Sequence, residues 1–251
     1  MSMSQTEKKP KRAGRRPRAA DGESPNNLTR EAVIAHALHL AQEENADAIT
    51  IARLASDLGV STGLIHYFVG SRDAMLAQVL NESRRSFVLG LNPPKGEWRE
   101  DLERLLIETH ESKLAWKGIT TYLAEHNRHR LFHDVESGER DYGLGYFDHF
   151  ARIMKNGGFS ADQAAMAYHL SMLFLESVAI SHLRRRMPAN HKDYLVDHMR
   201  QFDSEEYEGA AYMMGSFASV STDATVSTGL KLLLDAFESW LKPIKAVINE
   251  H

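Results

Sequence analysis

The hydrophobic pattern is helical over most of the chain, and its most informative part lies between residues 50 and 69. Ile51, Leu54, Ala55 and Leu58 recur at i, i+3, i+4 and i+7, which places them on one face of a short helix. Gly59 follows, and glycine adopts the left-handed conformation that ends a helix without steric strain. The pattern therefore predicts a first helix that stops at Gly59 and a sharp turn after it.

A second short helix is predicted to begin at Ser61. The side-chain oxygen of Ser61 can accept hydrogen bonds from the first amides of that helix. Ile65 and Val69 would then face inward. The two helices together form a helix-turn-helix, and the outward positions of the second helix are the candidates for contact with DNA bases and phosphates: Thr62, Gly63, His66 and Tyr67.

The rest of the chain predicts an all-α protein of two domains. Thr29 can cap a helix that runs to about residue 44. Another helix is predicted from 71 to 88, and Pro93 and Pro94 end the regular pattern after it. We assign residues 28–90 to a three-helix DNA-binding domain and 91–251 to a second helical domain. Its helices are predicted at 97–116, 118–131, 139–156, 160–186 and 225–242, with a loop over 203–225 that acts as a lid or is disordered.

The segment LTREAVIAHALHLAQEENADAITIARLASDLGVSTGLIHYFVGSRDAMLAQVL, Leu28 to Leu80, resembles the DNA-binding domain of the tetracycline-repressor (TetR) family of transcription regulators. Thr50 as a cap, the turn Gly59-Val60-Ser61 and Gly70-Ser71-Arg72 carry the resemblance. It implies that Thr50, Thr62, Gly63, Tyr67 and Arg72 contact DNA, with Arg72 on a phosphate. We add Arg53, Ser61 and His66 as candidates.

Positive charge is concentrated at the N-terminus. The chain has a net charge of -4, yet residues 1–20 hold seven Lys or Arg residues and one Glu. Residues 1–27 are therefore expected to form a disordered basic arm, and Arg15 and Arg16 are candidates for a contact in the minor groove. The alternative is a solvated tail that aids solubility.

Two apolar helices suggest a dimer. The segment 164–183 is apolar on nearly all sides up to Glu176, and 226–241 carries a wide apolar stripe. Each could pack only within its own subunit. The resemblance implies instead that both pair across a two-fold axis, which would bring two recognition helices to major grooves about 34 Å apart. The candidate interface residues are Leu170, Leu173, Ser177, Leu230, Leu234, Phe237 and Leu241.

Residues 97–186 are rich in aromatic and methionine side chains, which suits a cavity for an apolar or aromatic effector. A looser resemblance of MKNGGFSADQAAMAYHLSML to the ligand-binding domain of regulators close to the tetracycline repressor implies a sensor of small molecules. For each residue alone, ordinary core packing is the alternative. The candidates are Thr109, His110, Trp116, Tyr122, His126, Tyr146, Phe150, Tyr168, Met172 and Glu176, with Leu105 and Phe147 beside them.

The remaining polar clusters point to no cofactor. His126, His129 and His133 have helical spacing next to Asp134 and could hold a transition metal, but a wet helix end explains them as well, and we expect no metal. The run 184–186 is interpreted as a cationic helix end. There is no cysteine, no signal-peptide pattern, and the longest charge-free apolar stretch, 163–175, is too short for a bilayer. A cytoplasmic protein without membrane contact is expected.

Three functions fit these features to different degrees. The favoured one is a ligand-responsive transcription regulator, a homodimeric repressor on a palindromic operator of double-stranded DNA that a small-molecule effector releases. An architectural DNA-binding protein without an effector is the alternative. A third is a metal-dependent phosphohydrolase using His110, His133, Asp134 and Asp197, which leaves residues 1–90 unexplained.

Overall fold

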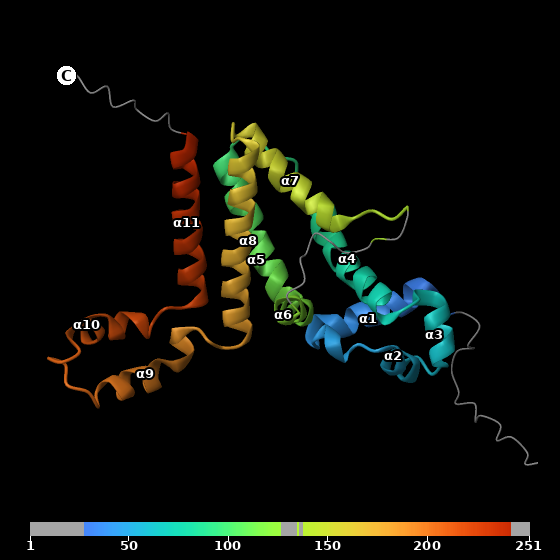
Figure 1. Cartoon of the computed structure of the whole chain (residues 1–251), viewed down its shortest axis with the longest axis horizontal. Coiled ribbons are helices and arrows are strands. Elements are labelled where there is room, and N and C mark those ends of the chain that lie inside the picture. The colour runs from blue at the N-terminus through green and yellow to red at the C-terminus, as the bar shows by residue number, and fades with distance from the viewer. Residues whose placement is uncertain (1–27, 127–134, 136–137, 242–251) are drawn as a thin grey trace, which may run out of the picture.

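The computed structural model describes residues 28–126, 135 and 138–241, and the regular elements among them are all helices. Figure 1 shows a small helical head, α1 to α3, at one end of α4, and a larger body of long helices at the other. The all-α prediction is confirmed. The elements are α1 (Arg30–Glu43), η2 (Ala46–Ala48), α2 (Ile51–Asp57), α3 (Thr62–Val69), α4 (Arg72–Gly90), α5 (Trp98–Ala115), α6 (Lys117–Glu125), α7 (Tyr142–Asn156), α8 (Ala161–Leu183), η3 (Pro188–His191), α9 (Lys192–Met199), α10 (Glu208–Phe217) and α11 (Thr222–Leu241).

Hydroxyl caps start α1, α2, α3 and α4. The side chains of Thr29, Thr50, Ser61 and Ser71 accept a hydrogen bond from the amide three residues later, at distances of 3.1 to 3.3 Å. Gly59 has a φ of +66° between α2 and α3, as the sequence predicts. The helix-turn-helix is thus specified by short-range signals.

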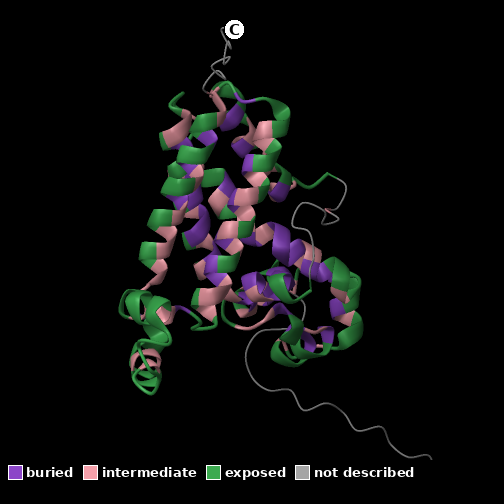
Figure 2. Cartoon of the chain, turned by 60° about the vertical axis from the view of Figure 1, so that its left-hand side comes forward, coloured by how far each residue is buried: buried purple, intermediate pink, exposed green. Residues whose placement is uncertain are grey.

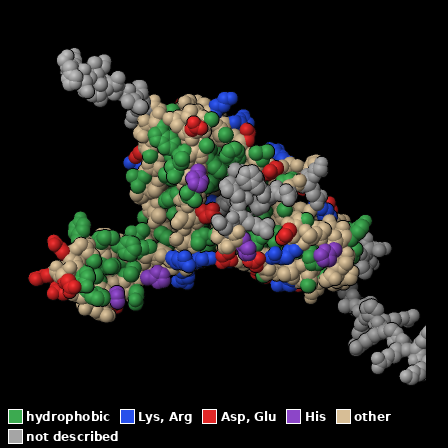
Figure 3. Space-filling model, viewed as in Figure 1, with side chains coloured by type: hydrophobic (Ala, Val, Ile, Leu, Met, Phe, Trp, Pro, Cys, Tyr) green, Lys and Arg blue, Asp and Glu red, His purple; other side chains and the backbone are tan. Residues whose placement is uncertain are grey.

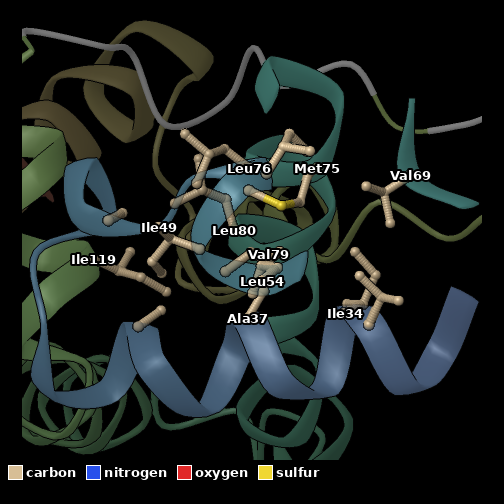
Figure 4. Close-up of a cluster of buried hydrophobic side chains, with 14 of the residues drawn as sticks. Ile34, Ala37, Ile49, Leu54, Val69, Met75, Leu76, Val79, Leu80 and Ile119 are labelled. Atoms are coloured by element: carbon tan, nitrogen blue, oxygen red, sulfur yellow. The ribbon is translucent and has the colours of Figure 1, made fainter. Parts of the chain in front are cut away.

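The core of the head receives part of its side chains from α6, far along the chain. Ile119, Tyr122 and Leu123 of α6 are buried in the same cluster as the apolar faces of α1 to α4. Figure 4 shows Ile119 beside Ile49 within this cluster. The helix can approach so closely because Gly118 has no side chain: a Cβ there would lie 1.9 Å from the carbonyl oxygen of Glu44. Residues on both sides of the predicted boundary near residue 90 therefore share one hydrophobic core.

The body is built around α8, which contacts α5, α6, α7 and α11. Leu175, Phe150 and Phe237 are buried in its core. Asn81 of α4 connects head and body, because its buried amide donates to the carbonyl of Arg140 at 2.9 Å and accepts from the amide of Tyr142 at 2.9 Å. These bonds fix the start of α7 against the middle of α4.

A buried carboxylate organises the connection between α4 and α5. Asp101 accepts hydrogen bonds from the backbone amides of Lys95 (2.7 Å) and Gly96 (3.1 Å), and from the side chain of Arg104. Burial by itself raises the pKa of Asp101, but the bonds from Arg104, Lys95 and Gly96 together hold that pKa below its ordinary value. The carboxylate is therefore charged at neutral pH.

The prediction of a loop over 203–225 was wrong, because α10 lies within it. Helices α9 and α10 form a hairpin that leaves the body at the end of α8 (Figure 1). Neither helix has a buried residue, and Tyr212 is 90% exposed. Figure 2 shows the hairpin with exposed and half-buried residues only, and Figure 3 shows hydrophobic side chains gathered on it. Two glycines and many polar residues conceal the helical period in this segment.

One stretch of the described chain, Ala161–Met199, is long and apolar enough to cross a membrane by length and composition alone. It extends well beyond the charge-free residues 163–175 on which the sequence prediction was based. In the structure this stretch includes α8, whose neighbours are α5, α6, α7 and α11. A core helix passes the same test.

Candidate nucleic-acid interface and ligand cavity

One face of α3, the predicted recognition helix, packs against the core of the head, and the opposite face is exposed. Ile65 and Val69 are buried in the core of the head, as predicted. The four outward candidates, Thr62, Gly63, His66 and Tyr67, are all exposed. Tyr67 is 82% exposed, and its ring meets the edge of the neighbouring Phe68 ring at 5.4 Å between centroids. The helix thus presents small and aromatic polar groups on a surface that is exposed in the described part of the chain.

The head contains few cations, and each has an acidic partner. Residues 28–80 hold three arginines against six acidic residues. Arg30 pairs with Glu139 at 2.9 Å, Arg53 with Asp57 at 2.8 Å, and Arg72 with Asp47 at 3.2 Å. The head therefore offers no net positive charge to a phosphate backbone.

Arg72 has a structural position that the sequence does not reveal. Its guanidinium donates to the carbonyl oxygens of Ile49 and Ala46, both at 3.2 Å, and so ties the start of α4 to the turn before α2. A phosphate contact by Arg72 stays a prediction from the resemblance. Thr50 and Ser61 act as caps, and Arg15 and Arg16 lie outside the described residues.

A cavity lies among helices α4 to α8, in the part of the body that adjoins the head. Five of the ligand candidates line it: Thr109, Trp116, Tyr146, Tyr168 and Met172. The hydroxyl groups of Thr109 and Tyr146 are 2.8 Å apart and hydrogen-bonded. The cavity thus combines aromatic walls with internal polar groups, as a site for a small molecule does.

Several other candidates lie elsewhere in the body. His110 is buried in α5, where burial and the nearby charges of His182 and Lys113 lower its pKa. Phe150 is in the core of the body, with Leu105. Glu176 is half-buried on α8, and Phe147 packs edge-on against the Tyr168 ring. Core packing therefore describes Phe150 and Leu105, and a ligand contact by the other residues stays a prediction.

Tyr122 and His126 of α6 are absent from the lining of this cavity, because both side chains contact the head. Tyr122 is buried in the head's core. His126 stacks on the Tyr122 ring at 4.4 Å between centroids, and its Nε2 lies 3.0 Å from the carboxylate of Asp47. His129 and His133, the other members of the suggested metal cluster, lie outside the described residues.

Helix α4 and one lysine contribute to the cavity in a way that the sequence prediction missed. Ser83, Arg84 and Phe87 line the cavity from α4, and Lys113 lines it from α5. Lys113 follows the buried positions 102, 106 and 109 at helical spacing. A lysine in an otherwise apolar stripe was a signal, present in the sequence, of a charged group inside the body.

The fold is shared with solved structures of transcription regulators. Apo ActR from Streptomyces coelicolor matches with a TM-score of 0.69 at 18% identity, over 87% of this chain and 97% of that one. ActR in complex with actinorhodin matches at 0.68 and 19%, over 85% and 98%. A TetR variant from Acinetobacter baumannii in complex with minocycline matches at 0.57 and 19%, over 89% and 100%. The chain has the fold of the TetR family. No family model matches the sequence, and no curated protein is similar to it in sequence.

In this TetR-family fold, helices α4 and α6 contribute side chains both to the core of the head and to the wall of the cavity. The first half of α4 contributes Met75 and Val79 to the head's core, and its second half lines the cavity. Ile119 and Leu123 of α6 are buried in the head's core and line the cavity as well. A molecule in the cavity would therefore touch side chains that position the recognition helix.

Polar contacts reinforce this junction. The carboxylate of Glu125 accepts from Asn45 of the head and from Arg184 at the end of α8, both at 2.6 Å. Lys117 of α6 pairs with Glu43 of α1. The end of α6 is thus joined to the head on one side and to the longest helix of the body on the other.

The predicted dimer residues divide into two groups. Leu230, Leu234 and Phe237 are fully buried within the chain, where they pack in the core of the body, so their assignment to a subunit interface was wrong. Leu173 and Ser177 are exposed, and Leu170 and Leu241 are half-buried. A stripe of one amphipathic helix does not reveal which of its neighbours covers it.

The residues of the phosphohydrolase hypothesis do not meet in the part of the chain that the structure describes. His110 is buried in α5, whereas Asp197 is exposed on α9 and pairs with Arg200 at 2.7 Å. His133 and Asp134 lie outside the described residues. The geometry gives no support to joint catalysis by these groups.

Proposed function

We propose that this protein is a ligand-responsive, homodimeric transcription regulator whose helix α3 reads a palindromic operator, and that it acts as a repressor. The observation that carries the proposal is the exposed face of α3, with Tyr67 at its centre, on a helix fixed by buried Ile65 and Val69. Apart from its edge contact with Phe68, the Tyr67 ring is exposed, so most of its surface is open to a partner. A major groove accepts a helix of this kind.

Release by an effector is supported by the shared helices. A molecule in the cavity contacts Ile119 and Leu123, which also pack in the core of the head. If it binds better when α6 and α4 hold the heads at another spacing, it shifts the population away from the DNA-bound state. The repressor would then leave its operator.

Dimer formation is supported by apolar side chains of α8 and α11 that are exposed in the described part of the chain. Met166 and Leu173 of α8 are 50% and 55% exposed, and Leu232 of the adjacent α11 is 64% exposed. Met166 and Leu173 are two helical turns apart, so they share one face. We assign this face to the partner subunit, together with the uncovered α9–α10 hairpin.

The basic arm supplies the phosphate attraction that the head lacks. The three arginines of the head are paired, while residues 1–20 hold seven cations. Contacts from Arg15 and Arg16 would add affinity for any DNA sequence without adding specificity.

An electrophoretic shift with the DNA upstream of the protein's own gene tests the proposal. The wild type is expected to give a discrete complex, and Tyr67→Ala or Thr62→Ala to weaken it about tenfold or more, as the loss of a good base contact does. The control His39→Ala changes an exposed residue on α1 and should bind as the wild type does. Equal affinity of Tyr67→Ala and wild type would remove α3 from the DNA interface.

A further inference from the structure

His66, in the middle of α3, is joined to the residue that ends the helix. Its Nδ1 lies 2.8 Å from the carbonyl oxygen of Gly70. The amide of Gly70 in turn donates to the carbonyl of His66 at 2.9 Å. Gly70 has a φ of +70° and a ψ of -130°, a backbone conformation that favours glycine. This turn therefore holds a hydrogen-bond acceptor beside one nitrogen of the exposed imidazole ring.

The bond to Gly70 determines which ring nitrogen carries the proton. A carbonyl oxygen only accepts hydrogen bonds, so Nδ1 of His66 must donate and must carry a hydrogen. In a neutral imidazole the other nitrogen, Nε2, then has no hydrogen and acts as an acceptor. Within the described part of the chain Nε2 has no hydrogen-bond partner. Neutral His66 therefore presents an acceptor, and no donor, to a molecule that binds α3.

The surface around His66 leaves room for the edge of a base pair. Thr62 and Gly63 lie four and three residues before His66, so they are its neighbours on the helix surface, and all three are exposed. Gly63 has no side chain. Within 4 Å, a Cβ at Gly63 would meet only the hydroxyl oxygen of Ser61 among the described atoms, at 3.9 Å. A base can therefore approach the imidazole from this side.

We propose that His66 selects a base with an exocyclic amino group, adenine or cytosine, at one position of each operator half-site. The inference rests on the proposed function, which places α3 in the major groove, and adds the chemistry of one base contact. In that groove adenine N6 and cytosine N4 are donors, whereas guanine offers two acceptors and thymine an acceptor and a methyl group. Nε2 can accept from the first two bases and faces a lone pair on the other two.

Competition binding at pH 8, where free imidazole is neutral, tests the base preference. The operator that the wild type selects from a random pool is remade with each of the four bases at every position. At one position of each half-site, adenine or cytosine should give about tenfold tighter binding than guanine or thymine, as one mismatched base pair usually does. Replacing that adenine by purine, or that cytosine by 2-pyrimidinone, deletes the amino group and should weaken binding by the same factor.

Variants assign this preference to His66. His66→Ala should abolish the preference at that position and leave the other positions as in the wild type. His66→Arg should change the preferred base to guanine, to which arginine can donate two hydrogen bonds. The control His39→Ala, at an exposed histidine of α1, should keep the preference. The proposal is overturned if no position changes in His66→Ala, or if the position that changes favours guanine or thymine in the wild type.

The position of the proton is measured separately, without DNA. Two-bond correlation spectra of the full-length protein, labelled with 15N-histidine and recorded at pH 8, distinguish protonated from unprotonated ring nitrogens. The signals that disappear in His66→Ala should show a protonated Nδ1 and an unprotonated Nε2, and the reverse pattern would refute the assignment. If the wild type selects no operator, the proposed function fails together with this contact. If it selects one that His66→Ala reads identically, this contact alone fails.

Discussion

A methyl group at Gly118 should push helix α6 away from helix α1. The Cβ of Gly118→Ala would lie 1.9 Å from the carbonyl oxygen of Glu44 and 2.6 Å from that of Ala41, both of them backbone atoms. Ordinary van der Waals contact begins at about 3.4 Å, so no side-chain rotation can relieve the overlap. Helix α6 must therefore move away from the end of α1.

The energetic consequence follows from what α6 covers. Ile119, Tyr122 and Leu123 are buried in the head's core and would be drawn partly out of their packing. Overpacking in a well-packed core costs about 1–3 kcal/mol. Because rigid backbone opposes the new methyl group, we expect the upper end, about 3 kcal/mol. For a domain of this size that corresponds to a fall in Tm of about 6–12 °C.

Urea unfolding followed by circular dichroism measures this difference. Gly215→Ala is the matched control, because Gly215 lies inside α10 and no atom lies within 4 Å of the position that its new methyl group would take. That variant should gain about 0.5–1 kcal/mol, the usual difference between Ala and Gly in a helix. Stability of Gly118→Ala within about 0.5 kcal/mol of the wild type would refute the close approach of α6 to α1.

Three further predictions concern other parts of the molecule. The carboxylate of Asp101 has a lowered pKa in the folded state, so it stabilises the fold above its unfolded pKa of about 3.9 and this stabilisation disappears as the pH falls through the folded pKa. Asp101→Asn should therefore be less stable than wild type at pH 7, and thermal unfolding should show the difference shrinking below about pH 4; a difference independent of pH would contradict the charged hydrogen-bonded state. Leu173→Glu places a charge on the open face of α8 and should give a monomer in sedimentation velocity, while Leu144→Glu, at an exposed position on α7, should sediment as the wild type does; two identical profiles would exclude that face from the interface. Deletion of residues 2–20 should weaken binding to all DNA sequences and flatten the plot of log affinity against log salt by about 0.9 for each phosphate that the arm neutralises, whereas an unchanged slope would mean that the arm does not touch DNA.

The head was predictable because its signals are local. Gly59, Ser61 and the four-residue spacing of Ile65 and Val69 specify a turn, a cap and a buried face within a few residues. These features need no information about the rest of the chain. The exposed positions on α3 then follow from the helical period alone.

The body was less predictable, since its packing joins distant segments. No local pattern indicates that α6 packs against α1 through Gly118, and this close approach turns Tyr122 and His126 out of the cavity. The stripe of α11 was recognised, but Phe237 packs inside the chain instead of against a partner. The amphipathic period specifies that a face is covered and leaves the covering element open.

Selection of bound duplexes from a randomised DNA pool tests the central claim most directly. The wild type should enrich an inverted repeat whose half-sites are separated by about one or more helical turns, as two α3 helices of a dimer require. Tyr67→Ala, with unchanged stability and sedimentation, should enrich no such repeat. Enrichment of the same repeat by both proteins, or of none by the wild type, would contradict a dimer that reads DNA through α3.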